Sequence, residues 1–433
     1  MTSVISSPPS APAVRAKQPA ESVPGPVLVV LVFQNLFNAY SPYLTTAINI
    51  LVAIAVLVRH GGSLRRPEPV VITTAYFVLA WLLLVAAYRG SADLQVLLKY
   101  FRVALAVTVF ILIFAAGRIS ASVVTKAVNF SLAFHVLLIL AQIAVPELSR
   151  LSAPIFGFER EITILEEYAM RKLGASSSYD TASLLSVTAL LFFQMQYAKG
   201  KGTRFLFLTA AAFIATLMSS RAGIALSLLI VGVICLKALR GVDLKRRVLA
   251  ITGTVLLAAF AGLLVLPLVL HTLGVSELGP DDAGLIFAAT DYGTTGTWDA
   301  LTDEHLQPLD QPLVGLIFGY AIDPNSIGRF TDIGYVKLVY HVGIVGTAAV
   351  LLAHGYMLLA TRKFLRQAAG DGDRELICRL LFWLVAISII FNYKSLELHS
   401  RGIGDFIYML FLFLAHRAPP LRRRVQSQTG CTP

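Results

Sequence analysis

Charged residues are scarce in this chain. Asp, Glu, Lys and Arg make up only 14% of its 433 residues, whereas hydrophobic residues make up 56%. A water-soluble domain carries roughly a quarter charged residues, and a chain this apolar cannot hide its hydrophobic side chains in a soluble core. Because apolar runs near the roughly 20-residue length of a bilayer span recur along the sequence, the composition predicts an all-α polytopic integral membrane protein.

Cysteine is also scarce, and familiar cofactor motifs are missing. Cys235, Cys378 and Cys431 lie in two apolar segments and the C-terminal tail, so neither a disulfide framework nor a zinc site is expected. The sequence has no P-loop, no dinucleotide-binding glycine pattern and no HExxH motif. It also has no internal repeat of the kind that marks many transporters. We therefore expect no metal and no cofactor.

Hydropathy predicts about twelve transmembrane spans. They are 27–41, 43–58, 69–88, 97–117, 123–145, 181–198, 204–219, 222–238, 248–270, 334–360, 376–393 and 402–416. Only Ser41 and Pro42 separate the first two, which form either a tight hairpin or one long broken helix.

The basic residues indicate the orientation. The net charge is +11, but Lys and Arg cluster in short loops between apolar runs, which argues against a nucleic-acid partner. These loops share one side of the membrane if both termini are cytoplasmic and the first two spans form a hairpin. They lie near 15–17, 59–66, 118–126, 199–204, 237–247, 362–374 and 417–424.

This orientation predicts three regions. A disordered cytoplasmic tail occupies 1–26, a polytopic membrane domain 27–417, and a basic cytoplasmic tail 418–433. Within the membrane domain, large loops at about 146–180 and 271–333 face the opposite side.

A polar stretch runs directly into an apolar segment and is the first candidate for chemistry. It reads FGYAIDPNSIGRFTDIGYVKLVYHVGIVG from Phe318 to Gly346, and loops placed by a rigid scaffold commonly carry function. Its polar side chains include Asp323, Asn325, Arg329, Asp332, Tyr335, Lys337 and His341. Several residues of this stretch also have a structural interpretation. Asp332 at a helix start is often only a cap, and His341 is commonly a buried core histidine. The spacing of Gly343 and Gly346 usually indicates close helix packing.

Basic residues on the non-basic side break the orientation rule. Arg221 lies in the short turn SSRAG, where its forked guanidinium suits phosphate oxygens; the alternative is an arginine that snorkels to lipid headgroups. Lys99 and Arg102 share a helix face, and Arg102 lies inside an apolar run, where a basic group is costly and is normally paired or functional. Arg401 and Asp405 are one turn apart and are expected to pair with each other.

Two other groups of polar residues have structural readings. Between 159 and 172, Glu159, Arg160, Glu161, Glu166, Glu167, Arg171 and Lys172 predict an amphipathic surface helix. Asn129, His135 and Gln142 within the fifth span are expected to make hydrogen bonds between helices.

The 318–346 segment and the SSRAG turn resemble elements of the Wzy-type polysaccharide polymerases and the related O-antigen ligases. In those families a large periplasmic loop ends in a short polar motif, followed by a helix with a Gly-Ile-x-Gly-like element. The ligases carry a His-Asn pair where this chain has Asp332 and Ile333, which favours a polymerase. Length and layout are also similar to those of a xanthan-type exopolysaccharide polymerase.

The resemblance implies a GT-C-like architecture in the bacterial inner membrane and a polymerase that uses undecaprenyl-diphosphate-linked oligosaccharide. It implies catalytic roles for Arg221, Arg329 and Asp332, with Asp332 orienting or deprotonating the acceptor hydroxyl. It also implies substrate binding by a wider set that neutralises the diphosphate. That set is Lys99, Arg102, Tyr335, Lys337, His341 and Arg401. A chain-length-regulating copolymerase, a flippase and membrane lipid are the implied partners.

Three other functions stay open. A transporter or flippase of lipid-linked oligosaccharide suits about twelve spans, although the chain lacks an internal repeat. A ligase would join finished glycan to another acceptor. A structural subunit of an envelope complex is the third.

Overall fold

The computed structural model describes residues 24–37, 42–60, 68–116, 119–156, 172–176, 178–219, 312–328, 331, 333–393, 398 and 402–417. Within these ranges the regular structure is helical, and no strand occurs. The helices are α1 (Gly25–Phe37), α2 (Pro42–His60), α3 (Pro69–Arg89), α4 (Leu94–Ala116), α5 (Ala121–Ala144), α6 (Glu147–Phe156), α8 (Tyr179–Ala198), α9 (Arg204–Leu217), α14 (Leu313–Phe318), α15 (Gly334–Gln367), α16 (Gly372–Phe391) and α17 (Ile403–Arg417), with a 3₁₀ turn at Pro324–Ile327.

Ten of the predicted spans coincide with helices whose ends differ by a few residues, α15 running on to Gln367. The predicted spans 222–238 and 248–270 lie outside the described residues, as does the predicted surface helix at 159–172 except for Lys172. Lys172 is buried and not helical, and its N–H donates to the Met218 carbonyl at 2.8 Å, so it does not belong to an exposed charged face. By length and composition, α3, α4, α5 and α15 are long and apolar enough to cross a membrane. The described part of the chain is therefore a helical bundle of the kind expected in a membrane.

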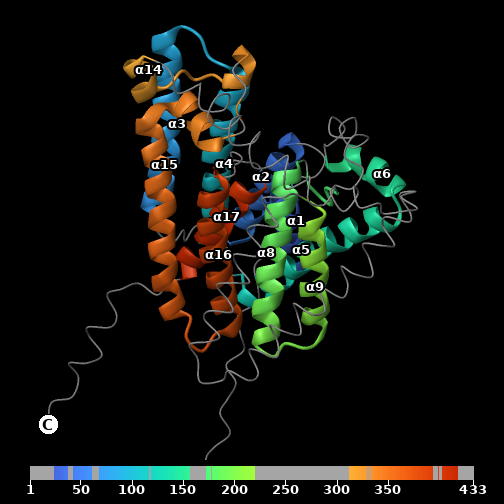
Figure 1. The fold of residues 1–433 in the computed structure, drawn as a ribbon. Helices are drawn as coiled ribbons and strands as arrows, with labels where there is room; N and C mark the ends of the chain where they lie inside the picture. Colours follow the sequence, from blue (N-terminus) through green and yellow to red (C-terminus); the bar gives the residue numbers. More distant parts are fainter. Residues whose placement is uncertain are drawn as a thin grey trace, which may run out of the picture.

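The bundle surrounds one central helix. The sequence of α17, IGDFIYMLFLFLAHR, is apolar on all sides, and a helix of that kind is expected to be buried. Every side chain from Ile403 to Leu414 is indeed buried. Helix α17 packs against α1, α4, α15 and α16, and Figure 1 shows it in the middle of the assembly.

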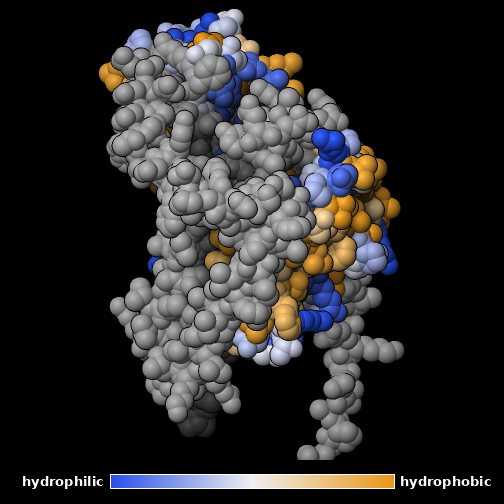
Figure 2. All heavy atoms as spheres, turned by 45° about the vertical axis from the view of Figure 1, so that its right-hand side comes forward, coloured by the Kyte–Doolittle hydropathy of each residue, from blue (hydrophilic) through white to orange (hydrophobic). Residues whose placement is uncertain are grey.

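The outer surface carries the apolar side chains that the core does not use. Figure 2 shows an apolar area on the side of the described bundle that it presents, with hydrophilic residues above and below it. Large hydrophobic side chains such as Leu51, Val58, Leu84 and Leu352 are more than half exposed on α2, α3 and α15. Such a band matches the hydrocarbon region of a bilayer.

The two ends of the bundle are chemically distinct. At one end, which we call the loop end, the α3–α4 turn meets the 319–328 loop, because Asp93 N–H donates to the Ala321 carbonyl at 2.9 Å. At the opposite end the α8–α9 turn is joined to the start of α16. There Lys199 pairs with Glu375 at 2.7 Å and Lys201 pairs with Asp373. The loops at 199–204 and 362–374, predicted to share one side of the membrane, thus lie together.

The start of the chain forms two separate helices. The amide groups of Asn35 in α1 and Asn49 in α2 exchange hydrogen bonds of 2.9 and 2.8 Å. These residues are 14 positions apart, a distance of about 21 Å along a straight helix. The chain therefore folds back between α1 and α2, in agreement with the hairpin reading.

Polar residues inside α5 join it to neighbouring segments, as predicted. The Nδ1 atom of His135 accepts from Ala175 N–H at 3.2 Å, so its Nε2–H is the donor to the Ala182 carbonyl, also at 3.2 Å. Gln142 accepts from Gly174 N–H at 2.9 Å, and Asn129 accepts from Gln196 on α8. The buried 172–176 segment is anchored in the bundle by these bonds.

Helix α15 is interrupted at Gly343, whose φ of 66° and ψ of −178° are not helical. Three successive carbonyls before the break find other donors. Tyr340 and His341 accept from the N–H groups of Tyr320 at 2.7 Å and Ala321 at 3.1 Å, and Val342 accepts from Trp81 Nε1 at 2.9 Å. The prediction that Gly343 and Gly346 form a helix-packing motif is thus partly wrong, because Gly343 breaks the helix and lets the loop dock against it.

Gly343 should tolerate no side chain. A Cβ atom there would clash with the Ile317 carbonyl oxygen, and the left-handed conformation alone costs about 1–2 kcal/mol for an L residue. We expect Gly343→Ala to lower the melting temperature of the detergent-purified protein.

Gly355, in the same helix, provides the matched control. Among the described residues, no neighbouring atom lies within 4 Å of the position that a Cβ atom would take there. Gly355→Ala should therefore be neutral or stabilising by up to about 1 kcal/mol. Equal melting temperatures for the two variants would show that the break at Gly343 is not needed.

Candidate functional site

The first turns of α4 carry the polar groups on which the candidate site is built. Arg102 extends from α4 to the carboxylate of Asp405 on α17, with which it forms an ion pair. The two side chains are only 11% and 8% exposed. Asp405 was predicted to pair with Arg401, which lies outside the described residues, so that pair stays a prediction. Its pairing with Arg102 makes Asp405 a neutralising partner, as expected, for a residue 303 positions away.

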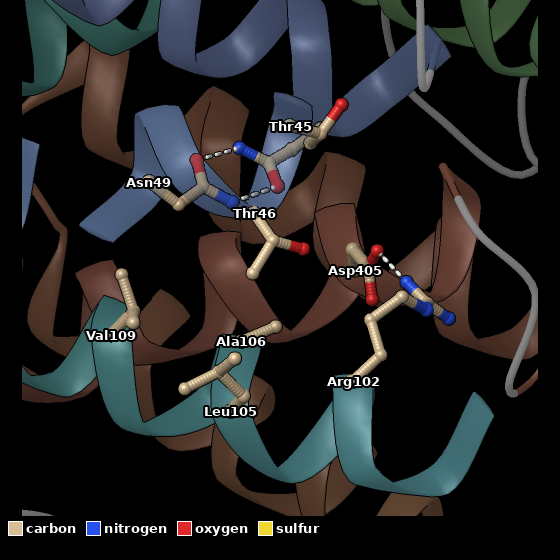
Figure 3. A pocket seen from close by; sticks show the side chains of 9 residues that line it. Thr45, Thr46, Asn49, Arg102, Leu105, Ala106, Val109 and Asp405 are labelled. Atoms are coloured by element: carbon tan, nitrogen blue, oxygen red, sulfur yellow. Dashed lines mark hydrogen bonds and ion pairs between the residues drawn. The ribbon is translucent and has the colours of Figure 1, made fainter. Parts of the chain in front are cut away.

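A small polar cavity lies beside this ion pair. Figure 3 shows Arg102 and Asp405 close to the Asn35–Asn49 pair, with Thr45 and Thr46 nearby. The cavity has a volume of about 10 Å³, which is room for about one water molecule. In this conformation the cavity is a small polar space between α1, α2, α4 and α17, and is too small for a sugar.

A second polar group lies on the face of α4 that meets α15. The hydroxyl of Tyr100 lies 3.3 Å from Nδ1 of His341, and Nε2 of His341 lies 3.8 Å from Oδ2 of Asp323. The second distance is too long for a hydrogen bond, and the contact is an ion pair only when His341 is protonated. His341 is fully buried, whereas the Asp323 side chain is 29% exposed. Asp323 is therefore the member of this group that solvent or a ligand can reach.

Local geometry explains why Asp323 takes this position. It precedes the 3₁₀ turn Pro324–Ile327, and its Oδ1 accepts from Asn325 N–H at 2.9 Å. Two residues earlier, Ala321 has a left-handed φ of 57°, unusual for a residue other than glycine. The cap and the docked backbone of the 319–321 loop together direct the carboxylate towards α15.

Asp323 is ionised at neutral pH. Partial burial acts to raise the pKa of its carboxyl, but His341, the Asn325 N–H and the Lys337 ammonium lower it, so that the pKa falls to about 2. The hydrogen bond from Asn325 is well formed at 2.9 Å, whereas the His341 contact is long. We therefore assign most of the lowering to the backbone donor and to Lys337.

The other predicted substrate-binding residues have separate roles. Lys99 and Lys337 lie within electrostatic range of His341, and both place positive charge at the loop end. Tyr335 donates its hydroxyl hydrogen to the Ile389 carbonyl, so it links α15 to α16. The structure thus places His341 and Lys337 within electrostatic range of Asp323 and Lys99 within range of His341, whereas Arg102 pairs with Asp405 on α17.

The three residues predicted to be catalytic, Arg221, Arg329 and Asp332, lie outside the described residues. The pairing of His341 with Tyr100 and Asp323 was not predicted. Asp323 followed by Pro324 and Asn325 is a recognisable turn signal, but nothing in the sequence relates Tyr100 to α15. The only sign of the Asn35–Asn49 pair in the sequence is that each amide stands alone within an apolar run, which is a weak indication that the two bond to each other.

No protein-family model matches the chain, and no curated protein matches its sequence. The likeness to polysaccharide polymerases therefore rests on the 318–346 segment and the SSRAG turn alone.

The Arg102–Asp405 pair should be essential as a pair. Removing one partner from a buried ion pair typically costs about 3–5 kcal/mol, whereas replacing both with apolar residues is often neutral. We expect Arg102→Met and Asp405→Leu each to lower the melting temperature in detergent, and the double variant to recover most of the loss. A double variant less stable than either single variant would contradict this account. Polymer synthesis by the stable double variant would show that the pair is purely structural.

Asp323 should make stability depend on acid pH. Its ordinary pKa of 3.8 falls to about 2 in the fold, so its contribution of about 2 kcal/mol is complete above about pH 5 and is lost as the pH falls from about 4 towards 2. In Asp323→Asn, which keeps the turn cap, the melting temperature should fall less steeply over this range. Parallel pH profiles for the wild type and the variant would refute the assignment.

Proposed function

We propose that this chain is a membrane glycosyltransferase of the polysaccharide-polymerase kind. It joins undecaprenyl-diphosphate-linked oligosaccharide units at the periplasmic face of a bacterial inner membrane, with both chain termini in the cytoplasm. The observation that carries the proposal is the polar group at the loop end, where Asp323 lies beside the buried His341 and the charges of Lys99 and Lys337 act on it, at the end of an apolar helical bundle. Ionisable residues in membrane helices are costly and usually functional.

The reaction needs two kinds of group. A bond forms between the acceptor hydroxyl oxygen and C1 of the donor sugar, the bond from C1 to the diphosphate breaks, and the hydroxyl proton passes to a base, the role proposed for Asp332. Positive charge must stabilise the departing undecaprenyl diphosphate, and Lys99 and Lys337 can supply it. The exposed carboxylate of Asp323 can accept a hydrogen bond from the acceptor hydroxyl and orient it.

His341 has a positioning role in this scheme. It is buried between Tyr100 and Asp323, so it cannot contact a sugar directly in this conformation. It holds the carboxylate towards the bundle, as an orienting partner does in other acid–base sites. Arg221, Arg329 and Asp332 stay proposed as further catalytic residues, and Arg401 as a further substrate-binding one. A flippase and a chain-length-regulating copolymerase stay proposed as partners.

A flippase is the second candidate, because one observation favours it. Membrane carriers often bind substrate at broken helices, and α15 is broken at Gly343. The break is nevertheless covered by the end of α14 and by Gly319, whose backbone atoms occupy the space beside Gly343. This favours a structural use of the break and places the flippase second.

The two candidates predict different intermediates in a deletion strain. Loss of a polymerase leaves single repeat units on lipid at the outer leaflet, and loss of a flippase leaves them at the inner leaflet. Loss of a ligase instead leaves long polymer on lipid. We expect single units at the outer leaflet, detected by leaflet-specific labelling of the extracted lipid-linked glycan. Units confined to the inner leaflet would overturn the polymerase proposal.

Complementation of the same strain tests Asp323. Asn caps a turn about as well as Asp, so Asp323→Asn should insert normally but reduce polymer yield by at least about tenfold, the effect of losing a group that orients the acceptor hydroxyl. Asp371 is the matched control, because its side chain also accepts a capping bond, from Arg374 N–H at the opposite end of the bundle. Wild-type polymer from Asp323→Asn, or equal losses from Asp371→Asn, would remove Asp323 from the site.

A further inference from the structure

Arg89 occupies a distinctive position at the loop end. It is the last residue of α3, followed by Gly90 in a left-handed conformation that caps the helix. Its guanidinium carbon lies 4.6 Å from the centre of the Tyr320 ring, and Tyr320 stacks in turn on Tyr340 with the ring centres 5.4 Å apart. Side chains from α3, the 319–328 loop and α15 therefore form one stack, which fixes the plane of the guanidinium. Figure 1 shows these three segments together.

The edge of this guanidinium has no partner within the described part of the chain. The Nε and Nη2 atoms of Arg89 are buried, and neither makes a hydrogen bond to a described residue. Their N–H groups point the same way and form the fork that binds two oxygens of a carboxylate or phosphate. The aromatic contact engages only the face of the cation, so it does not satisfy these donors. Buried polar groups are normally hydrogen-bonded, so a fork that is held in one plane with both donors unsatisfied suits an oxyanion.

We infer that Arg89, positioned by Tyr320, is an anion-binding subsite that takes two oxygens of a phosphate or carboxylate. It deepens the proposed function and depends on it for the source of the anion. That source is either the diphosphate of the lipid carrier or the carboxylate of an acidic sugar in the glycan. Lys99 and Lys337 add positive charge at the same end, whereas the ionised Asp323 opposes anion binding and favours a site on the Arg89 side of Tyr320.

Direct binding measurements test the subsite without requiring polymerisation. Inorganic pyrophosphate and glucuronate are titrated calorimetrically into the full chain purified in detergent. Arg89→Gln should weaken binding of the preferred anion by about tenfold or more, the effect of losing charge-assisted hydrogen bonds. Arg89→Lys should also weaken it, because an ammonium keeps the charge but loses the fork.

Two further positions separate this subsite from a general effect of losing positive charge. Arg374 also has buried Nε and Nη2 atoms that bond to no described residue, but it lies at the opposite end of the bundle. Arg374→Gln should leave affinity within about twofold of the wild type, as expected for a position that shares no contacts with the subsite. Tyr320→Phe keeps the aromatic ring and should bind as the wild type does, whereas Tyr320→Leu should bind more weakly. Melting temperatures identify any variant that fails to fold; if Arg89→Gln does, Arg89→Lys carries the test.

The outcomes identify the source of the anion, and they show separately whether the Arg89 subsite or the polymerase proposal fails. Tighter binding of pyrophosphate assigns the subsite to the lipid carrier, and tighter binding of glucuronate assigns it to an acidic sugar. Wild-type affinity for both anions in Arg89→Gln, or an equal loss in Arg374→Gln, overturns the inference. If the anion binds through Arg89 but the deletion strain accumulates no single lipid-linked units at the outer leaflet, the subsite stands and the polymerase proposal fails.

Discussion

Backbone hydrogen bonding in an apolar environment is the constraint on which the loop end depends. Water is absent from the bilayer core, so every backbone group there needs a protein partner, and each unsatisfied one costs several kcal/mol. The break at Gly343 removes the normal donors of three carbonyls in α15. The N–H groups of Tyr320 and Ala321 and the indole of Trp81 replace them. The same bonds that repair α15 therefore fix the loop that carries Tyr320 and Asp323.

Buried charge imposes the second constraint. Arg102 and Asp405 neutralise each other in the middle of the bundle, and this arrangement ties α4 to the central helix α17. The polar group around His341 lies on another face of α4 and connects it to α15. Helix α4 thus joins the central helix to the outer helix that supports the polar loop. Its charged residues, Lys99 and Arg102, lie within the first three turns from the loop end.

The sequence predicts the helices well and the contacts between them poorly. Bilayer-length apolar runs fix where α3, α4, α5 and α15 lie, because hydropathy is a local property. The cost of burying Arg102 also indicated that it has a partner, but the partner is on α17 and not nearby in the chain. The sequence suggested only the local partner Arg401 for Asp405, because a contact between α4 and α17 cannot be found without knowing how the helices pack. The break at Gly343 was missed for a related reason: a glycine pair favours close packing and helix interruption equally.

The central position of α17 has a consequence for how the molecule is made. Helix α17 follows the other described helices in the chain, so it leaves the ribosome after they do. Its neighbours α1, α4, α15 and α16 must therefore enter the bilayer before the helix that fills the space between them exists. Until α17 has been made, Arg102 on α4 has no Asp405 carboxylate to pair with. The ion pair that joins α4 to the central helix can therefore form only after the last of the described helices has been synthesised.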